Sequence, residues 1–289
     1  MSRLVVALLW ALHLLPLGAQ AALGRGLGNL LYFALPGRRR VTRINLEKCF
    51  PAMPEVERRR IARRHYQVLV RAFLEHGLLW WSPRERIERL IRLEGLENAR
   101  ALGGQAAIVL VPHFVALDAC ATRLICELDM VGIYARQRDA VFERLVAHGR
   151  TRFGHQKLVS RQEGVRAAIA AMKNDGMSLF YLPDQDPSGQ KALFVPFFGV
   201  PAATQPGLAR IAKITGAKVL PCITKMLPGG EGYVVRIDPA WENFPSGDLE
   251  ADTRRMNECI ERAVLEMPEQ YLWTHKRFKR RPEGEAPFY

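Results

Sequence analysis

The sequence lacks the features that mark several large classes of protein. Its five cysteines are an odd number without CxxC spacing, which argues against a disulfide framework or a zinc site and favours reduced thiols in a cytosolic domain. It has no Gly-x-Ser-x-Gly element of the kind that carries an esterase nucleophile. Zinc-finger spacing, helix-turn-helix patterns and aromatic RNA-binding signatures are also missing. A secreted esterase, a metal enzyme and a nucleic-acid-binding protein are therefore disfavoured, and no cofactor is expected.

Length and charge narrow the choice further. The 289 residues suit one sizeable domain with appendages, and a hydrophobic fraction of 48% argues against a polytopic membrane protein. The net charge is +13, and residues 1–100 hold 18 Lys/Arg against 8 Asp/Glu, so +10 of the excess lies in the first third. In the absence of a nucleic-acid signature, this charge predicts an acidic protein partner or an anionic membrane surface.

The N-terminal segment predicts a membrane anchor. Leu4 to Gly24 carries no formally charged residue, and its 21 residues are enough to cross a bilayer. Ala19-Gln-Ala21 resembles a signal-peptidase site, so a cleaved secretory signal is an alternative. The apolar character resumes at residues 27–35 and Arg38 to Arg40 follow, which favours an uncleaved anchor over residues 1–24 with a cytoplasmic domain beyond it. Residues 25–100 are expected to form a basic, amphipathic helical region whose arginines face lipid head groups or solvent.

The central part of the chain contains a candidate catalytic base. The apolar, β-branched run Ile108 to Val111 predicts a buried strand that Pro112 ends. His113 follows at a strand-to-helix junction, where α/β proteins place catalytic groups. Asp118, in the first turns of the next helix, can reach back to orient the ring, which gives a base without a nucleophile of its own. Taken alone, the pair also fits a capping histidine beside an aspartate that stabilises a helix dipole.

Strands and helices are expected to alternate over residues 101–289. A second strand at residues 132–135 leads into Arg136 and Arg138, and a third at residues 177–182 ends at Pro183, followed by Asp184 and Asp186. Further strands are expected at 91–96, 218–225 and 233–237, and helices at 114–128, 162–174, 204–215 and 252–267. Residues 194–201 read as an apolar loop. This pattern predicts an α/β fold with a mixed central sheet flanked by helices.

Several blocks together resemble the lysophospholipid acyltransferase superfamily, and within it the lipid A late acyltransferases, the lauroyl and myristoyl transferases of Gram-negative bacteria. The blocks are His113-Phe-Val-Ala-Leu-Asp118, Leu182-Pro-Asp-Gln-Asp186, Phe194-Val-Pro-Phe-Phe-Gly199, Pro268-Glu-Gln-Tyr-Leu-Trp273 and Arg277-Phe-Lys-Arg-Arg-Pro-Glu-Gly284. Glycerolipid members of the superfamily carry Phe-Pro-Glu-Gly-Thr where this chain has the Leu182 block. This departure disfavours a glycerol-phosphate acceptor.

The resemblance implies a membrane-bound acyltransferase at the bacterial inner membrane with its catalytic domain facing the cytoplasm. It would move a fatty acyl chain from acyl carrier protein to a hydroxyl of a phosphorylated lipid A precursor. His113 would be the general base and Asp118 the carboxylate that orients it. Acyl carrier protein, the phosphorylated glycolipid and anionic inner-membrane lipid are the implied partners. The alternatives are another glycolipid acceptor, such as a phosphatidylinositol mannoside, and a non-catalytic membrane-docking protein whose His–Asp pair is structural.

Candidate substrate-binding residues follow from the phosphates on such an acceptor. A guanidinium group suits bidentate phosphate contacts, and Arg136 is the first candidate because it directly follows a strand expected in the same sheet. The competing arginines are Arg138, Arg150 and Arg152. Asp184 and Asp186 would hold the phosphate-binding arginines or the acceptor sugar, or would cap the turn after their strand.

Overall fold

The protein is built on a mixed seven-stranded sheet. A computed structural model describes residues 2–137, 139–186 and 191–289. The strands are β1 (Ile91–Glu94), β2 (Ile108–Leu110), β3 (Met130–Tyr134), β4 (Gln156–Ser160), β5 (Ser178–Tyr181), β8 (Val219–Met226) and β9 (Tyr233–Ile237). Their order across the sheet is β1-β9-β8-β2-β5-β3-β4, and neighbours run parallel except β8 and β9. The predicted α/β fold with a mixed sheet is confirmed, and β4 is a strand that the sequence did not suggest.

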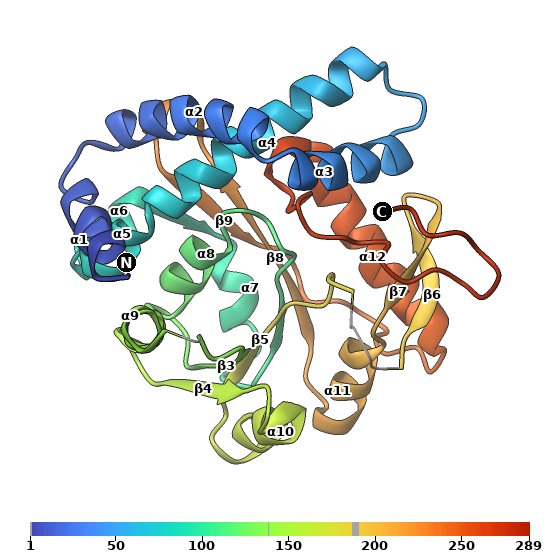
Figure 1. Cartoon of the computed structure of the whole chain (residues 1–289). Coiled ribbons are helices and arrows are strands. Elements are labelled where there is room, and N and C mark those ends of the chain that lie inside the picture. The colour runs from blue at the N-terminus through green and yellow to red at the C-terminus, as the bar shows by residue number, and fades with distance from the viewer. Residues whose placement is uncertain (1, 138, 187–190) are drawn as a thin grey trace.

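Helices cover both faces of this sheet (Figure 1). The central strand β2 is buried on both sides: Val109 packs into one hydrophobic cluster, and Ile108 and Leu110 pack into the other. The Val109 side is covered by α5 (His76–Trp81), α6 (Arg84–Leu90), α8 (Leu117–Leu124) and α9 (Ala140–Thr151). The opposite side is covered by α10 (Gly164–Asn174), α11 (Gly207–Thr215) and α12 (Leu249–Glu266). The short helix α7 (Leu96–Arg100) leads into β2.

The expected apolar loop at residues 194–201 is a β-hairpin. Strands β6 (Leu193–Phe197) and β7 (Val200–Thr204) pair antiparallel and form a small sheet of their own beside α12 (Figure 1). Val195 and Phe197 are fully buried, whereas Phe194 is exposed, as alternation along a strand requires. Pro196 and Pro201 lie within the two strands and made the segment look like a loop, but proline is tolerated in the edge strands of a two-stranded sheet.

The predicted membrane-spanning anchor over residues 1–24 is not supported. The segment is divided between α1 (Ser2–Leu12) and α2 (Leu17–Ala34), with a bend that ends at Pro16. Proline lacks the backbone N–H that a continuous helix needs and is compatible only with a helix start, so α2 begins directly after it. In the described part of the chain, no helix combines the length and the apolar character needed to cross a bilayer.

The N-terminal helices instead lie along one edge of the molecule (Figure 1). After α2 come α3 (Pro36–Cys49) and α4 (Glu55–Leu74), and α2 packs along α4 at very short range. Gly24 and Gly28 make this possible, because a Cβ at Gly24 would lie 2.6 Å from the Cβ of Arg71 and one at Gly28 would lie 2.5 Å from the Cα of Gln67. The basic helix α4 ends at Leu74, and α5 begins at His76 after a break at Glu75.

The outward side of α1 and α2 is also apolar. Large hydrophobic side chains that remain exposed there are Leu4, Leu8, Trp10, Leu14, Leu23, Leu27, Leu30 and Phe33. A helix that packs on a protein with one face normally presents polar side chains on the other. The outer face of α1 and α2, which we call the N-terminal apolar face, is therefore a hydrophobic surface whose exposure to water is unfavourable.

Candidate active site

The register of two neighbouring strands brings His113 beside Asp184. Strands β2 and β5 are parallel, and Leu110 is paired with Tyr181 at their carboxyl ends. Three residues after Leu110 is His113, and three residues after Tyr181 is Asp184. Each follows a proline that ends its strand, so both chains leave the sheet in the same way and at the same edge. The two side chains therefore meet although they are 71 residues apart in the sequence.

The Asp184 carboxylate holds His113 by two hydrogen bonds. The ring Nδ1–H donates to Oδ1 over 2.6 Å, and the backbone N–H of His113 donates to Oδ2 over 2.9 Å. Burial of Asp184 opposes its ionisation, but His113 and the cation of Arg277 outweigh this effect and lower the pKa of Asp184 below its usual range. An ionised carboxylate on Nδ1 fixes the neutral tautomer of His113 with its lone pair on Nε2. The His113 side chain is 15% exposed, so the pair is not closed off from solvent.

A second segment holds the His113 loop from the other side. Residues Pro268–Arg281, which we call the C-terminal strap, begin with the short 3-10 helix η2 (Pro268–Gln270). The backbone N–H of Leu272 donates to the His113 carbonyl, and the backbone N–H of Val115 donates to the Gln270 carbonyl. Gln270 is in turn bonded through its side-chain amide to both the N–H and the carbonyl of Met226 in β8. The strap thus fixes the loop to the sheet as an additional antiparallel strand would.

Asp118 does not contact His113, which corrects the predicted pairing. Its carboxylate accepts from Nε2 of His76 over 3.2 Å and from the guanidinium of Arg150 over 3.0 Å, joining α5, α8 and α9. Burial opposes the charge on Asp118, but Arg150 and His76 outweigh it and hold the pKa of Asp118 well below its usual range. Burial also opposes the charge on His76, but its bond to Asp118 raises the pKa of His76 above its usual value.

The remaining predicted binding residues lie at different places. Arg136 is exposed two residues beyond β3, whose carboxyl end adjoins that of β5, and Arg138 lies outside the described residues. Arg152 donates to the carbonyls of Leu79 and Ser82, so it fastens α9 to α5. Asp186 forms an ion pair with Arg280 over 3.4 Å and donates its backbone N–H to the Nε2 atom of His275, another member of the C-terminal strap.

An apolar cavity extends from this edge of the sheet beneath α8 and α9. It contains about 530 Å³ of empty space, part of it continuous with solvent, and runs along β3 and β4. The lining residues are mostly aliphatic or aromatic and include Leu117, Ala121, Ile125, Gly132, Ile133, Phe180 and Leu182. Leu182 lies two residues before Asp184 in the chain, and the Asp118–Arg150 pair forms part of the wall. The cavity thus suits a chain-like apolar group.

Three contributors to this site were missed from the sequence alone. The sequence predicts only substrate binding or turn capping for Asp184, predicts no role for His76, and singles out the strap only through two of the resembling blocks. The signal for Asp184 was present, because Pro112-His113 and Pro183-Asp184 repeat the same strand-end pattern. His76 and the strap left no such pattern, since their contacts depend on how distant segments pack.

Comparison with known proteins gives consistent matches along the chain. The sequence model of the family described as bacterial lipid A biosynthesis acyltransferase matches residues 1–280. The lipid A biosynthesis lauroyltransferase of Escherichia coli (strain K12) is 32% identical over 292 residues, which cover 100% of this chain and 94% of that protein. The palmitoleoyltransferase of the same organism is 30% identical over 98% of this chain and 92% of its own length. The myristoyltransferase is 31% identical over 93% and 82%, respectively.

Proposed function

The chain belongs to the bacterial lipid A biosynthesis acyltransferase family and is an acyltransferase, and from this premise we propose that it transfers a fatty acyl chain from acyl carrier protein to a hydroxyl of a lipid A precursor. The observation that carries the proposal is the His113–Asp184 pair, in which the Nδ1 bond to the carboxylate leaves Nε2 of the imidazole for a substrate, at the edge of the sheet where the apolar cavity also begins. This arrangement needs no protein nucleophile, because the acceptor hydroxyl itself attacks.

The proposed reaction is a direct acyl transfer. His113 Nε2 removes the proton of the acceptor hydroxyl as its oxygen attacks the thioester carbonyl carbon. The tetrahedral intermediate then collapses: the carbon–sulfur bond breaks, the ester bond remains, and the imidazolium returns the proton to the departing thiolate. Asp184, bonded to Nδ1, stabilises the imidazolium in both steps. A positioned base of this kind contributes about 10²–10⁴-fold to the rate.

The cavity provides a place for the acyl chain. Its apolar wall follows β3 from Tyr134 near the carboxyl edge to Met130 at the other end, so a chain that enters beside Asp184 would lie along the sheet. Gly132 is at the middle of this wall, and a Cβ built there meets no heavy atom within 4 Å. We therefore propose that the depth of the cavity near Gly132 determines which acyl-chain length the enzyme selects.

Among the arginines, Arg136 is the best candidate for the acceptor phosphate. Arg150 is bonded to Asp118, and Arg152 is occupied by two backbone carbonyls. Arg136 is exposed at the carboxyl edge of the sheet, where an acceptor bound to His113 would lie. Its planar guanidinium can bind a phosphate through two parallel hydrogen bonds.

The N-terminal apolar face would hold the enzyme on the membrane that contains its acceptor. Helices with an apolar outer face lie in the lipid interface, and flanking cations strengthen the attraction to anionic head groups. Exposed arginines border this face at Arg3, Arg25, Arg38 and Arg40. Docking of this kind on the cytoplasmic leaflet of the inner membrane leaves the His113 edge accessible to acyl carrier protein, whose acidic surface suits the net charge of +13.

A reconstituted assay tests the proposal. Purified enzyme is incubated with an acylated carrier protein and a tetra-acylated lipid A precursor in vesicles, and mass spectrometry follows the addition of one acyl chain. We expect transfer by the wild type and a loss of about 10³-fold or more for His113→Ala, whose folding is checked by circular dichroism. Transfer to a mannosylated phosphoinositide but not to the lipid A precursor would replace the acceptor, and unchanged turnover in His113→Ala would refute the base assignment.

A further inference from the structure

Arg277 of the C-terminal strap is a buried cation without an ion-pair partner among the described residues. Its side chain is only 2% exposed, and it donates to the Ala203 carbonyl over 2.9 Å and to the Thr204 hydroxyl over 2.8 Å. Its guanidinium carbon lies 5.1 Å from the centre of the Phe197 ring. Its Nε–H has no hydrogen-bond acceptor among the described residues. Burying a charge without a counter-ion in contact is energetically costly, so the position calls for an explanation.

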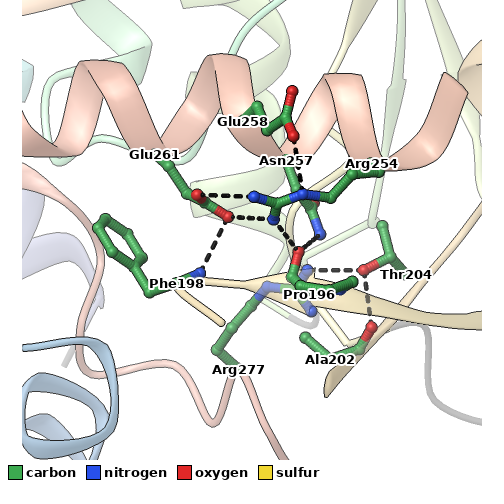
Figure 2. A network of polar contacts seen from close by, with 9 residues as sticks. All are labelled: Pro196, Phe198, Ala202, Thr204, Arg254, Asn257, Glu258, Glu261 and Arg277. Atoms are coloured by element: carbon green, nitrogen blue, oxygen red, sulfur yellow. Dashed lines mark hydrogen bonds and ion pairs between the residues drawn. The ribbon is translucent and has the colours of Figure 1, made fainter. Parts of the chain in front are cut away.

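The need to hold the β6–β7 hairpin in place does not explain the buried charge of Arg277, because a neighbouring arginine also holds the hairpin and is neutralised by carboxylates. Figure 2 shows Arg254 reaching from α12 to the hairpin, where it donates to the Pro196 carbonyl over 2.7 Å. The same guanidinium is paired with Glu261 over 2.7 Å and with Glu258 over 2.9 Å. Arg277 approaches the hairpin from the strap and has no such carboxylates (Figure 2).

The strap also carries Arg277 into the electrostatic environment of His113 and Asp184. Gln270 and Leu272 of the strap bond directly to the backbone of the His113 loop, and Arg277 follows Leu272 by five residues. Asp184 is 1% exposed, so both charges lie in a medium that screens them poorly. Consistent with this, Arg277 lowers the pKa of Asp184, after the larger effects of burial and of His113.

Building on the proposed function, we propose that Arg277 is a positioning residue for catalysis: its buried positive charge holds the His113–Asp184 pair with the carboxylate charged and the imidazole neutral. In this state Nε2 can accept the proton of the acceptor. The pair then carries one negative charge, which Arg277 balances across the site. Protonation of the pair removes that negative charge and leaves Arg277 uncompensated, so Arg277 disfavours protonation.

The other ionisable groups around the His113–Asp184 pair are either uncharged near pH 7 or paired with a group of opposite charge. They are His275, Tyr271, Cys49, Tyr289, Glu261, Asp186, Arg280, Asp118, Arg150 and His76. Burial lowers the pKa of His275 to about 4 and raises the pKa of the Tyr271 and Cys49 side chains, so these groups are neutral near pH 7. Burial also raises the pKa of Tyr289 to about 12.

The charged groups in this set form pairs of their own. Glu261 is matched by Arg254, and Asp186 by Arg280. Asp118 is matched by Arg150 and by His76. Of these described groups, Arg277 is therefore the one cation without a paired carboxylate, and the charge state of the His113–Asp184 pair depends on it.

The test compares three substitutions of Arg277 with a matched control at Arg254. Arg277→Met removes the charge and the hydrogen bonds, Arg277→Gln keeps a donor for the hairpin, and Arg277→Lys keeps the charge. Without the charge, the acid limb of the pH profile of kcat/KM moves to higher pH. We expect Arg277→Met and Arg277→Gln to lose about tenfold more kcat/KM between pH 8 and pH 6 than the wild type, and Arg277→Lys to retain the wild-type limb. Arg254→Met should lower the melting temperature without moving the limb.

A second measurement does not depend on the proposed reaction. Nuclear magnetic resonance can follow the protonation of the His113 ring in the intact, substrate-free protein, with the signal assigned by its absence in His113→Gln. Protonation at higher pH in Arg277→Gln than in the wild type supports the inference even if no lipid A precursor is acylated. The inference would be refuted if Arg277→Gln had the acid limb of kcat/KM and the His113 ring titration of the wild type. It would also be refuted if Arg277→Lys shifted them as much as Arg277→Gln does. If Arg277→Met fails to fold, Arg277→Gln decides the outcome.

Discussion

Replacement of Asp184 by asparagine should remove the base without removing the fold. The carboxylate now accepts two hydrogen bonds from one residue, His113, through Nδ1–H and through the backbone N–H. An asparagine side chain offers one oxygen and one NH₂ group in the same place. The backbone N–H can only donate, so it takes the amide oxygen, and the NH₂ group is left facing Nδ1. The imidazole can adapt only by moving its proton to Nε2, where it can no longer accept one from the acceptor.

The size of the effect follows from that change of tautomer. Asp184→Asn loses the general base, worth about 10²–10⁴-fold, and the carboxylate that stabilises the imidazolium, so kcat should fall by about 10³-fold or more. Asp118→Asn leaves the base and its carboxylate in place, so we expect a loss of about tenfold or less from a disturbed cavity wall. Since Asp118 accepts hydrogen bonds from Arg150 and His76, its replacement should instead lower the free energy of unfolding by about 1–3 kcal/mol.

The assay is single-turnover acyl transfer with saturating donor, combined with urea unfolding of each variant at pH 7. At this pH the stabilisation by Asp118 is fully present, because its pKa is lowered in the folded state and the contribution is lost only as the pH falls through that lowered value. Activity that survives in Asp184→Asn but is abolished in a stably folded Asp118→Asn would refute the assignment. It would restore the pairing of His113 with Asp118 that the sequence first suggested.

Two further predictions concern the acyl chain and the membrane. Gly132→Val should fill the middle of the cavity and lower the ratio of kcat/KM for palmitoyl over lauroyl donors by about fourfold or more for each methylene displaced. Gly37→Val, at another glycine where a Cβ meets no heavy atom, should leave the ratio unchanged. An unchanged ratio in both variants would show that the acyl chain does not bind in this cavity. The double variant Leu27→Asp/Leu30→Asp should sharply reduce sedimentation with anionic vesicles. Val56→Asp should not, because Val56 lies outside the N-terminal apolar face, although it is more exposed to water than either leucine. Equal losses would show that exposed apolar side chains bind lipid without regard to position.

The sheet could be predicted from the sequence because its central strands are buried on both faces. A strand such as β2 must be apolar at every position, and the proline that follows it ends the run sharply. Strand β4, with the sequence Gln-Lys-Leu-Val-Ser, lies at the sheet edge and is partly exposed, so its composition resembles that of a loop. The hairpin of β6 and β7 was hidden by its prolines, which edge strands tolerate.

The N-terminal segment shows the opposite problem, since its composition fits more than one structure. Twenty-one uncharged residues satisfy the length requirement for a bilayer span, but composition does not report which side each residue faces. Gly24 and Gly28 recur on one side of α2 and allow the close approach of α4, so part of the apolar character serves packing. Only the remainder, on the outer side, is exposed.

Which carboxylate contacts His113 depends on a distance that the sequence does not measure directly. A helix that starts at Leu117 places Asp118 in its first turn, where it faces α5 and α9 and meets His76 and Arg150. The carboxylate for His113 comes from the adjacent strand, because parallel register matches two strands residue for residue and carries that match into the residues that follow. Proximity in the chain therefore favoured Asp118, whereas proximity across the sheet selects Asp184. The same register argument gives Pro112 and Pro183 the same structural place: each follows the end of its strand, at the point that lets the next side chain reach the other.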